Sequence, residues 1–329
     1  MKKWMAVALK FLVSGALIWF LLSGVDLGGA KTRIVEVAPD MLLLATLIFF
    51  VQISIAVVRW QIVLKAIGAP LGFAKAFRFT YMGAFFNQTL PSSVGGDAVR
   101  IYKAYRGGLA LGSSVNSVML ERVATVLGLL LLVVSVLPLF LPRLDEGAER
   151  LFLLGGIASL ILAVAGTFVL MVLDRLPGAF MAWRAIRGLA ALATDTRKVF
   201  LSPGSSFRVL ALSVAGHVNL TASVFVLALG LGLDVTFVDC LVLFPPVLLV
   251  TTLPISIAGW GVREGAMVAA FGLVGVPAEG ALVLSILFGL LSIAISLPGG
   301  VIWLMSQDRK EKIVIPEEES AAEAGVGGN

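Results

Sequence analysis

The chain has 329 residues, of which 59% are hydrophobic and only 14% are charged, and its mean hydropathy is +1.02. A soluble domain carries about a quarter charged residues, so this composition excludes a soluble globular protein and indicates a membrane protein. The formal net charge of +5 is therefore evidence about topology, and we do not expect nucleic acid as a partner. The single Cys240 cannot form an internal disulfide and the single His217 excludes a histidine-rich metal site, so we expect no metal and no cofactor.

Six apolar segments are long enough to cross a bilayer, because a transmembrane helix needs about 20 apolar residues. We expect these spans at residues 4–23, 41–66, 113–138, 151–173, 207–231 and 281–305. The first segment follows Lys2 and Lys3 and precedes small residues at 28–30, which is also the pattern of a cleaved signal peptide. We favour an uncleaved span, because the internal repeat described below needs it.

Two further apolar segments, 74–106 and 238–272, are interrupted by proline and glycine near their centres. Each has the pattern of two half-helices joined by a turn. A half-helix cannot cross the bilayer, but a pair can enter and leave on one side when protein surrounds the turn. We therefore expect two re-entrant helical hairpins.

The turns of these two hairpins carry the same motif. Residues 89–100 read TLPSSVGGDAVR and residues 252–263 read TLPISIAGWGVR, an offset of 163 residues without a gap. Seven of the twelve positions are identical. Segments interrupted by glycine and proline at matching places in two halves are the best sequence indication of a transport site. The alternative is a chance match between two loops rich in residues that are common in membranes.

The repeat extends beyond the motif, because an offset of 163 residues also brings the second and third spans close to the fifth and sixth. We therefore predict an all-α polytopic membrane protein with a first repeat at 1–140 and a second at 141–305. Three crossings in each half is an odd number, so the second half should be inverted. The two hairpins would then enter from opposite sides and meet near the midplane.

The distribution of positive charge tests this topology. With the N-terminus in the cytoplasm, 19 of the 25 lysine and arginine residues lie on the cytoplasmic side, five lie outside and Arg122 lies within a span. Cytoplasmic segments of membrane proteins carry the excess of lysine and arginine. We therefore predict both termini inside, residues 141–150 outside and residues 174–206 inside.

Two polar segments lie outside the repeat. Residues 178–200 alternate arginines with Phe, Trp, Ile and Leu, which predicts a helix on the anionic inner leaflet; the alternative is a plain cytoplasmic linker. Residues 306–329 are rich in Glu, Gly and Ala near their end and predict a disordered acidic cytoplasmic tail.

Charged residues at the two motifs are the first candidates for a substrate site, because ionisable groups inside a bilayer are costly and are kept for function or paired. Asp97 and Arg100 begin the returning half-helix of the first hairpin, and Arg263 and Glu264 hold the matching place in the second. A helix N-terminus offers unpaired N–H donors, so we expect the two arginines to hold a lipid phosphate together. The two carboxylates would orient the arginines, contact a cationic head group or carry a coupling proton. The alternative is that all four are structural ion pairs that fix the hairpins.

The remaining candidate substrate-binding residues lie around the motifs and are Gly96, Gly259, Glu121, Arg122, Asn87, Ser93 and Ser256. The two glycines are expected to leave backbone N–H groups open at the turns. Glu121 and Arg122 point to different faces of the third span, so they either pair with the hairpin or contact lipid. Asn87 lines the site or caps the broken helix. Arg59 near the end of the second span has the pattern of a snorkelling anchor, and His217 that of an interhelical hydrogen bond.

Three stretches together resemble a known family: LPSSVGGDAVR, the span with NSVMLERVATVLGLLLL, and LPISIAGWGVRE. They are similar to the lysylphosphatidylglycerol synthase transmembrane region, also called the flippase-like integral membrane family, and the resemblance covers about residues 5–305. It implies lipid translocation but does not name the lipid. We expect an anionic phospholipid or a polyprenyl lipid or glycolipid as the partner, in a bacterial inner membrane. Only 24 residues follow Met305, so we expect translocation without the synthase domain.

Two kinds of function compete. The first is a translocator whose halves rock about the hairpins and pass a polar head group between leaflets; it is not an enzyme. The second is an intramembrane enzyme acting on a lipid phosphate, with Asp97, Glu121 and Glu264 as acid and base groups. Its nucleophile would come from a serine of the turns, namely Ser92, Ser93 or Ser256. This reading lacks a histidine near the turns and a carboxylate pair with metal spacing, so we prefer the translocator. An accessory subunit of a lipid-modifying pathway is a third possibility.

Overall fold

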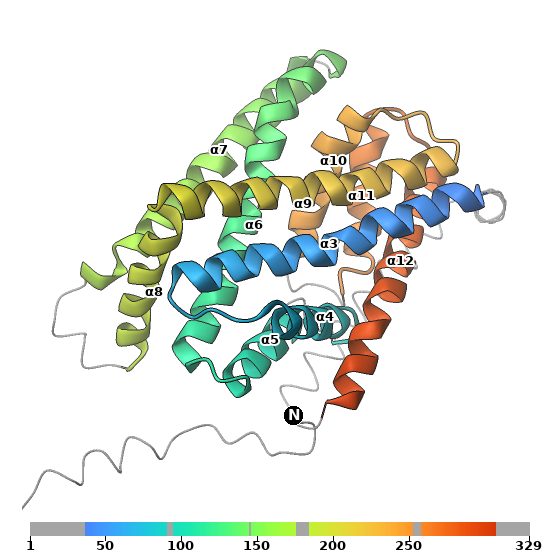
Figure 1. Cartoon of the computed structure of the whole chain (residues 1–329). Helices are drawn as coiled ribbons and strands as arrows, with labels where there is room; N and C mark the ends of the chain where they lie inside the picture. The colour runs from blue at the N-terminus through green and yellow to red at the C-terminus, as the bar shows by residue number, and fades with distance from the viewer. Residues whose placement is uncertain (1–36, 91–94, 145, 176–183, 253–257, 307–329) are drawn as a thin grey trace, which may run out of the picture.

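The computed structural model describes residues 37–90, 95–144, 146–175, 184–252 and 258–306, and these residues form helices without any strand. The helices are α3 (Pro39–Ala66), α4 (Phe73–Thr89), α5 (Gly95–Arg106), α6 (Leu111–Phe140), the short η1 (Leu141–Arg143), α7 (Glu146–Met171), the short η2 (Leu173–Arg175), α8 (Arg184–Phe200), α9 (Pro203–Gly230), α10 (Phe237–Thr251), α11 (Val262–Gly272) and α12 (Ala278–Met305). The predicted all-α class is therefore confirmed (Figure 1).

Five of the described helices are long and apolar enough to cross a membrane, namely α3, α6, α7, α9 and α12. They match the second to sixth predicted spans, and their ends differ from the predicted ends by a few residues. The chain is thus a multi-pass membrane protein. The predicted first span at 4–23 and the tail from residue 307 lie outside the described residues.

Each of the two interrupted segments forms a pair of packed helices, as the sequence predicts. Helices α4 and α5 pack against each other, and so do α10 and α11. Residues 91–94 and 253–257 between them, which include Ser93 and Ser256, lie outside the described part of the chain. Helix α10 begins with a reciprocal cap, in which the backbone N–H of Asp239 donates to Thr236 and the backbone N–H of Thr236 donates to the Asp239 carboxylate.

Helices α3 and α9 lie side by side and run in opposite directions (Figure 1). At one end the backbone N–H of Ala38 donates to the carbonyl of Gly230 at 3.3 Å. Further along, Ser223 donates to the carbonyl of Ala45 and Asn219 donates to the carbonyl of Ile48, each at 3.0 Å. Residue numbers on one helix therefore fall as those on the other rise. These are the two spans that the 163-residue offset relates.

The packing partners of the other helices also correspond between the two halves. Helix α4 packs against α12, and its counterpart α10 packs against α6; α5 packs against α6, and its counterpart α11 packs against α12. Elements that correspond in sequence therefore have corresponding partners. The first hairpin is held between its own half and the last helix of the second half.

Glycines allow this close packing at two places. A Cβ atom on Gly96 in α5 would lie 1.9 Å from the carbonyl oxygen of Gly83 in α4, and one on Gly299 in α12 would lie 2.1 Å from the carbonyl oxygen of Tyr81. Such distances exclude any side chain. The backbones of α4, α5 and α12 are in direct contact because these positions are glycine.

The predicted helix at 178–200 is observed as α8 over Arg184–Phe200, and its apolar face packs on the helical bundle. Leu192, Ala193 and Val199 are buried there, and Asn116 of α6 donates to Asp195 at 2.9 Å. The apolar face of α8 is thus covered by other parts of the protein. The predicted contact of residues 178–200 with the inner leaflet stays a prediction. Residues 178–183 lie outside the described part.

Candidate functional site

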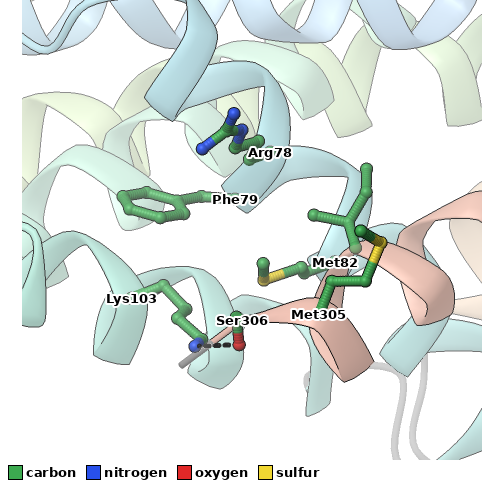
Figure 2. A pocket seen from close by; sticks show the side chains of 7 residues that line it. Arg78, Phe79, Met82, Lys103, Met305 and Ser306 are labelled. Carbon is green, nitrogen blue, oxygen red and sulfur yellow. Dashed lines mark hydrogen bonds between the residues drawn. The ribbon is translucent and has the colours of Figure 1, made fainter. Parts of the chain in front are cut away.

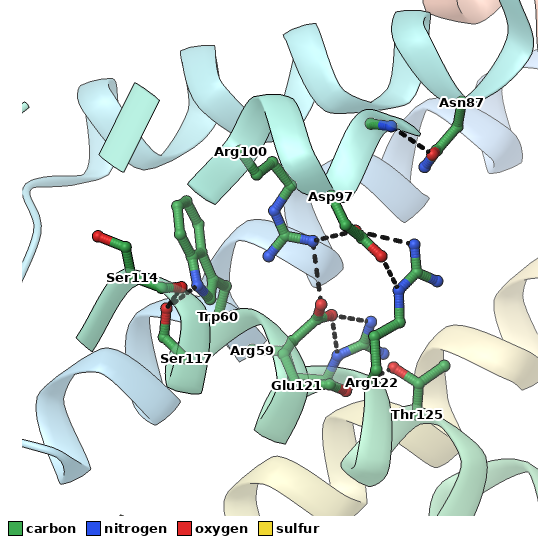
Figure 3. A network of polar contacts seen from close by, with 11 residues as sticks. Arg59, Trp60, Asn87, Asp97, Arg100, Ser114, Ser117, Glu121, Arg122 and Thr125 are labelled. Atoms are coloured by element: carbon green, nitrogen blue, oxygen red, sulfur yellow. Dashed lines mark hydrogen bonds and ion pairs between the residues drawn. The ribbon is translucent and has the colours of Figure 1, made fainter. Parts of the chain in front are cut away.

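Five charged side chains from three helices meet inside the protein (Figure 3). We call this set the charged cluster: Arg59 from α3, Asp97 and Arg100 from α5, and Glu121 and Arg122 from α6. All except Arg122 are at most 6% exposed. Charges inside a membrane protein are costly unless they are paired, so the pairing within the cluster explains how the fold tolerates it.

Glu121 lies at the centre of the charged cluster. Its Oε1 accepts hydrogen bonds from the Nε of Arg59 at 2.9 Å and from the Nη2 of the same side chain. Its Oε2 accepts from the Nη1 of Arg100 at 3.0 Å. One carboxylate therefore connects the second span, the first hairpin and the third span.

Asp97 and Arg122 form the second pair of the cluster. The Nε and Nη2 of Arg122 donate to the two carboxylate oxygens of Asp97 at 2.7 and 2.9 Å, which is the bidentate geometry typical of strong ion pairs. Asp97 lies only 3.7 Å from the Nη1 of Arg100, at the edge of a direct contact. Asp97 also lies in the first turn of α5, where the helix dipole favours a negative charge.

Arg100 is held on an aromatic face but is incompletely hydrogen-bonded. Its guanidinium carbon lies 4.5 Å from the ring centre of Trp60, whose Nε1 donates to Ser117 at 3.1 Å. The Nε and Nη2 of Arg100 are buried and have no hydrogen-bond partner within the described ranges. Buried guanidinium donors without an acceptor are unfavourable, so an anion placed beside them would be stabilised.

The charged cluster has an excess of positive charge and one exposed edge. Three guanidinium groups face two carboxylates, so the ionised cluster carries one more positive than negative charge. The side chain of Arg122 is 44% exposed. It lines a cavity of about 450 Å³ between α6 and α7 whose other walls are mostly apolar, including Val126, Ala163 and Leu170. The cluster therefore meets an apolar groove at Arg122.

The second hairpin has a smaller polar site. Arg263 donates to Glu264 Oε1 from its Nε at 3.1 Å and from its Nη2 at 2.8 Å, and Ser285 of α12 donates to the same oxygen at 3.0 Å. The guanidinium carbon of Arg263 lies 4.7 Å from the ring centre of Trp260. Gly289 leaves room for this side chain, because a Cβ atom there would lie 2.1 Å from its Nη2.

The two repeat-matched arginines thus have the same kinds of partners, namely a glutamate and a tryptophan face. Those partners are not matched by the repeat, since Arg100 uses Glu121 and Trp60 from other helices while Arg263 uses its own neighbours in sequence. Each arginine has its own carboxylate, and the described contacts contain none that joins the two sites. A joint phosphate clamp remains a prediction.

One detail of the sequence-based site needs correction. The glycine N–H groups at the turns are not all open, because Gly96 N–H donates to Asn87 Oδ1 at 2.9 Å and Gly261 N–H donates to Glu264 Oε2 at 2.5 Å. Asn87 therefore caps α5. Gly259 has a φ of +81°, a backbone conformation that favours glycine.

Arg59 is the site residue that sequence reasoning missed. We expected a snorkelling anchor, but it is 6% exposed and bonded to Glu121 in the charged cluster. Arg59 lies far from both motifs in the sequence, so the motifs gave no indication of it. The available signal was a charged residue directly before a tryptophan within an apolar span. Glu121 and Arg122 do pair with the hairpin, one of the two predicted alternatives. His217 forms the expected interhelical hydrogen bond, with its Nε2 3.0 Å from the carbonyl oxygen of Thr125.

A family model described as the lysylphosphatidylglycerol synthase TM region matches residues 7–300. No curated protein matches the chain. Among the described residues, the matched range includes α3, α6, α7, α9 and α12 as far as Gly300, both helix pairs and the charged cluster.

Proposed function

The chain belongs to the family of lysylphosphatidylglycerol synthase transmembrane regions, and from this premise we propose that it translocates a phosphate-bearing lipid between the leaflets of the membrane. The observation that carries the proposal is the charged cluster around Arg100. It combines excess positive charge, buried guanidinium donors without an acceptor and an edge at Arg122 that faces an apolar groove. A lipid with a phosphate head and acyl chains matches each of these features.

The arrangement of the helices supports a transport mechanism. Inverted repeats, with substrate sites at the interface between the halves, are a common plan of transporters. The antiparallel α3 and α9 and the exchanged partners of α4 and α10 fit such a plan. We propose that the α4–α5 and α10–α11 pairs are re-entrant hairpins that enter from opposite sides. Rocking of the two halves would then expose the charged cluster to each leaflet in turn.

An intramembrane enzyme fits the same residues less well. A general acid or base needs a carboxylate free to exchange a proton with substrate. Glu121 is bonded to two arginines, Asp97 to Arg122 in bidentate geometry, and Glu264 to Arg263 and Ser285. We propose that these carboxylates orient the arginines that bind the lipid, and that the protein is not an enzyme.

The lipid is proposed from this chemistry as an anionic phospholipid, with a polyprenyl phosphate lipid or glycolipid as the second candidate. We propose a bacterial inner membrane as its location, on the basis of the family. We also propose that both termini lie in the cytoplasm, on the basis of the charge distribution.

The test is a leaflet-accessibility assay on the purified full chain in proteoliposomes. Head-labelled phosphatidylglycerol, phosphatidylethanolamine and a polyprenyl phosphate are compared, and the label in the outer leaflet is bleached by an impermeant reductant. We expect bleaching beyond the outer-leaflet fraction for at least one lipid with a phosphate head. Bleaching equal to that of protein-free liposomes for every lipid would reject the proposal.

A further inference from the structure

The guanidinium group of Arg122 is exposed near the middle of a membrane span. Its side chain is 44% exposed, and the residue lies about 5 Å along the axis from the midpoint of the 30-residue helix α6. Arginines at the ends of a span reach the polar interface with their long side chains, but a position near the midpoint is too deep for this. The exposed part of Arg122 therefore needs a polar partner from outside the described protein.

Arg122 has hydrogen-bond donors left for such a partner. A guanidinium group has five N–H donors, and the described contacts use two of them, from Nε and Nη2 to Asp97 (Figure 3). The pair with Asp97 does not neutralise the charged cluster as a whole, which carries one more positive than negative charge. The favoured partner is thus an anion that accepts several hydrogen bonds, and a phosphate has both properties.

An apolar groove begins at Arg122 and follows the contact of α6 and α7. Its volume is about 450 Å³. The residues that line it on each helix are three or four positions apart, so they form one stripe on each helix. The lining includes Arg122, Val126 and Leu127 of α6 and Ala163, Gly166 and Leu170 of α7.

The groove is open beside Gly166 and closed beyond Leu127. Gly166 is exposed, and a Cβ atom there would meet nothing within 4 Å. Further along α6, Leu129 and Leu130 are buried and pack with Ala163 of α7. An apolar chain therefore fits for a short length next to Arg122, and its remainder would leave the groove on the open side.

The pocket of about 510 Å³ between α4, α5 and the end of α12 has a different character (Figure 2). There Lys103 is 2% exposed, and its Nζ donates to Ser306 Oγ at 3.0 Å. Ser306 follows the last residue of α12, so this pocket lies at the end of a span, where water can solvate the exposed Arg78. A cation at the end of a span needs no lipid partner, in contrast to Arg122.

We infer that the groove between α6 and α7 holds a phospholipid by its phosphate, at Arg122, and by the first part of one acyl chain, along Val126 and Ala163. A phosphate without a chain leaves the groove empty, and a chain without a phosphate leaves the exposed donors of Arg122 unused. The inference rests on the proposed function only for its place in transport, where it names the part of the lipid that stays between the helices. Binding itself needs no movement between leaflets.

The experiment is photo-crosslinking of the full chain in phosphatidylcholine nanodiscs. The probe is a trace of phosphatidylglycerol with a diazirine near the carboxyl end of one acyl chain, and a diacylglycerol with the same chains is the comparison without a phosphate. We expect adducts on residues 122–127 and 163–170, severalfold more with the phosphatidylglycerol probe. Excess inorganic phosphate should not displace this probe, because it offers nothing to the groove.

Two variants and one control locate the site. Gly166→Leu should fill the groove and reduce the adducts severalfold. Gly112→Leu is the matched control, because Gly112 is also exposed with open space around its Cβ but does not line the groove. Arg122→Gln should lower labelling by the phosphatidylglycerol probe to that of diacylglycerol. If Arg122→Gln does not fold, Gly166→Leu and the two probes still decide the question.

The possible results separate the lipid site from the proposed function. Equal labelling by the two probes in the native chain, or unchanged labelling in Gly166→Leu, would overturn the lipid site. Displacement by inorganic phosphate would also overturn it, because the site would then bind a free anion. Adducts in a chain that moves no lipid would reject the proposed function and leave the lipid site. Lipid movement without these adducts would reject the lipid site and leave the proposed function.

Discussion

The Oε2 of Glu121 accepts a hydrogen bond from the Nη1 of Arg100 at 3.0 Å, although the two residues belong to different membrane elements. This contact joins the first hairpin to the third span. The other oxygen of the same carboxylate accepts a hydrogen bond from Arg59, so the second span is connected to the same residue. The position of the hairpin therefore depends on one buried acid.

Glu121→Gln should destabilise the protein. The change leaves Arg59 and Arg100 buried without their anionic partner, and breaking a buried ion pair costs about 3–5 kcal/mol. We expect a lower melting temperature in detergent, measured from the change in tryptophan fluorescence during thermal unfolding. Glu146→Gln, at an exposed position in the first turn of α7, is the control and should leave it unchanged. Equal melting temperatures for both variants would show that the cluster does not need this charge.

Arg100→Ala and Arg263→Ala should each abolish lipid movement in proteoliposomes. Arg→Lys at either position should restore only part of the rate, because lysine keeps the charge but lacks the planar fork. Each lost charge-assisted hydrogen bond corresponds to about 1.5–3 kcal/mol, or roughly a tenfold to hundredfold change in rate. Native rates in both alanine variants would contradict the phosphate-binding role, and failure to fold would favour purely structural ion pairs.

Arg59→Ala is now expected to reduce lipid movement as well, since Arg59 holds Glu121 in place. The matched control is Arg208→Ala. The only hydrogen bond of that exposed side chain in the described structure is to the carbonyl of Gly204. The same proteoliposome assay measures both. A loss in Arg208→Ala equal to that in Arg59→Ala would indicate a general effect of positive charge.

Gly96→Ala should separate α4 from α5. The new Cβ would lie 1.9 Å from the carbonyl oxygen of Gly83, and overpacking of this kind costs about 1–3 kcal/mol. Gly265→Ala is the control in α11, because its Cβ would meet open space and alanine favours a helix by about 1 kcal/mol. We expect opposite shifts in melting temperature, and a tolerated Gly96→Ala would rule out the close backbone contact.

The topology can be tested by cysteine labelling after Cys240, which is buried, is replaced by alanine. Glu146→Cys should react with an impermeant maleimide from outside, and Leu201→Cys should react only after the membrane is opened. Both positions are exposed. If Leu201→Cys reacted from outside and Glu146→Cys only after the membrane was opened, the predicted orientation would be wrong.

The docking of α8 should weaken at low pH. Arg197 donates two hydrogen bonds to the carboxylate of Asp174, from Nη1 at 2.9 Å and from Nη2 at 2.5 Å. These bonds lower the pKa of Asp174. A carboxylate with a lowered pKa in the folded state contributes stability above its unfolded pKa, usually about 3.9, and loses it as the pH falls through the lowered value. The pair is partly exposed, so the effect should be small. The protection of α8 amides, taken relative to their intrinsic exchange rate at each pH, should fall in the native chain as the pH drops through the lowered pKa of Asp174. In Asp174→Asn this protection should change little over the same pH range.

Local features of the sequence determined the helices and their order. Apolar runs of the length of a bilayer predicted the five described spans, and proline with glycine at matched positions predicted where α4 gives way to α5 and α10 to α11. These features depend on neighbours in the chain, so a single sequence contains them. The motif also marked Asp97, Arg100, Arg263 and Glu264 as residues that share a polar environment within each half.

The tertiary structure alone decided which charges meet. Arg59 lies 62 residues before Glu121, and nothing in the spacing of the two indicates that α3 packs where its arginine reaches α6. The same packing places Trp60 under Arg100 and turns Asp97 from its near neighbour Arg100 towards Arg122. A buried charge takes the partner that packing brings within hydrogen-bond distance, because desolvation makes an unpaired charge so costly. The sequence could therefore determine that the charges need partners, and only the three-dimensional contacts could determine which ones.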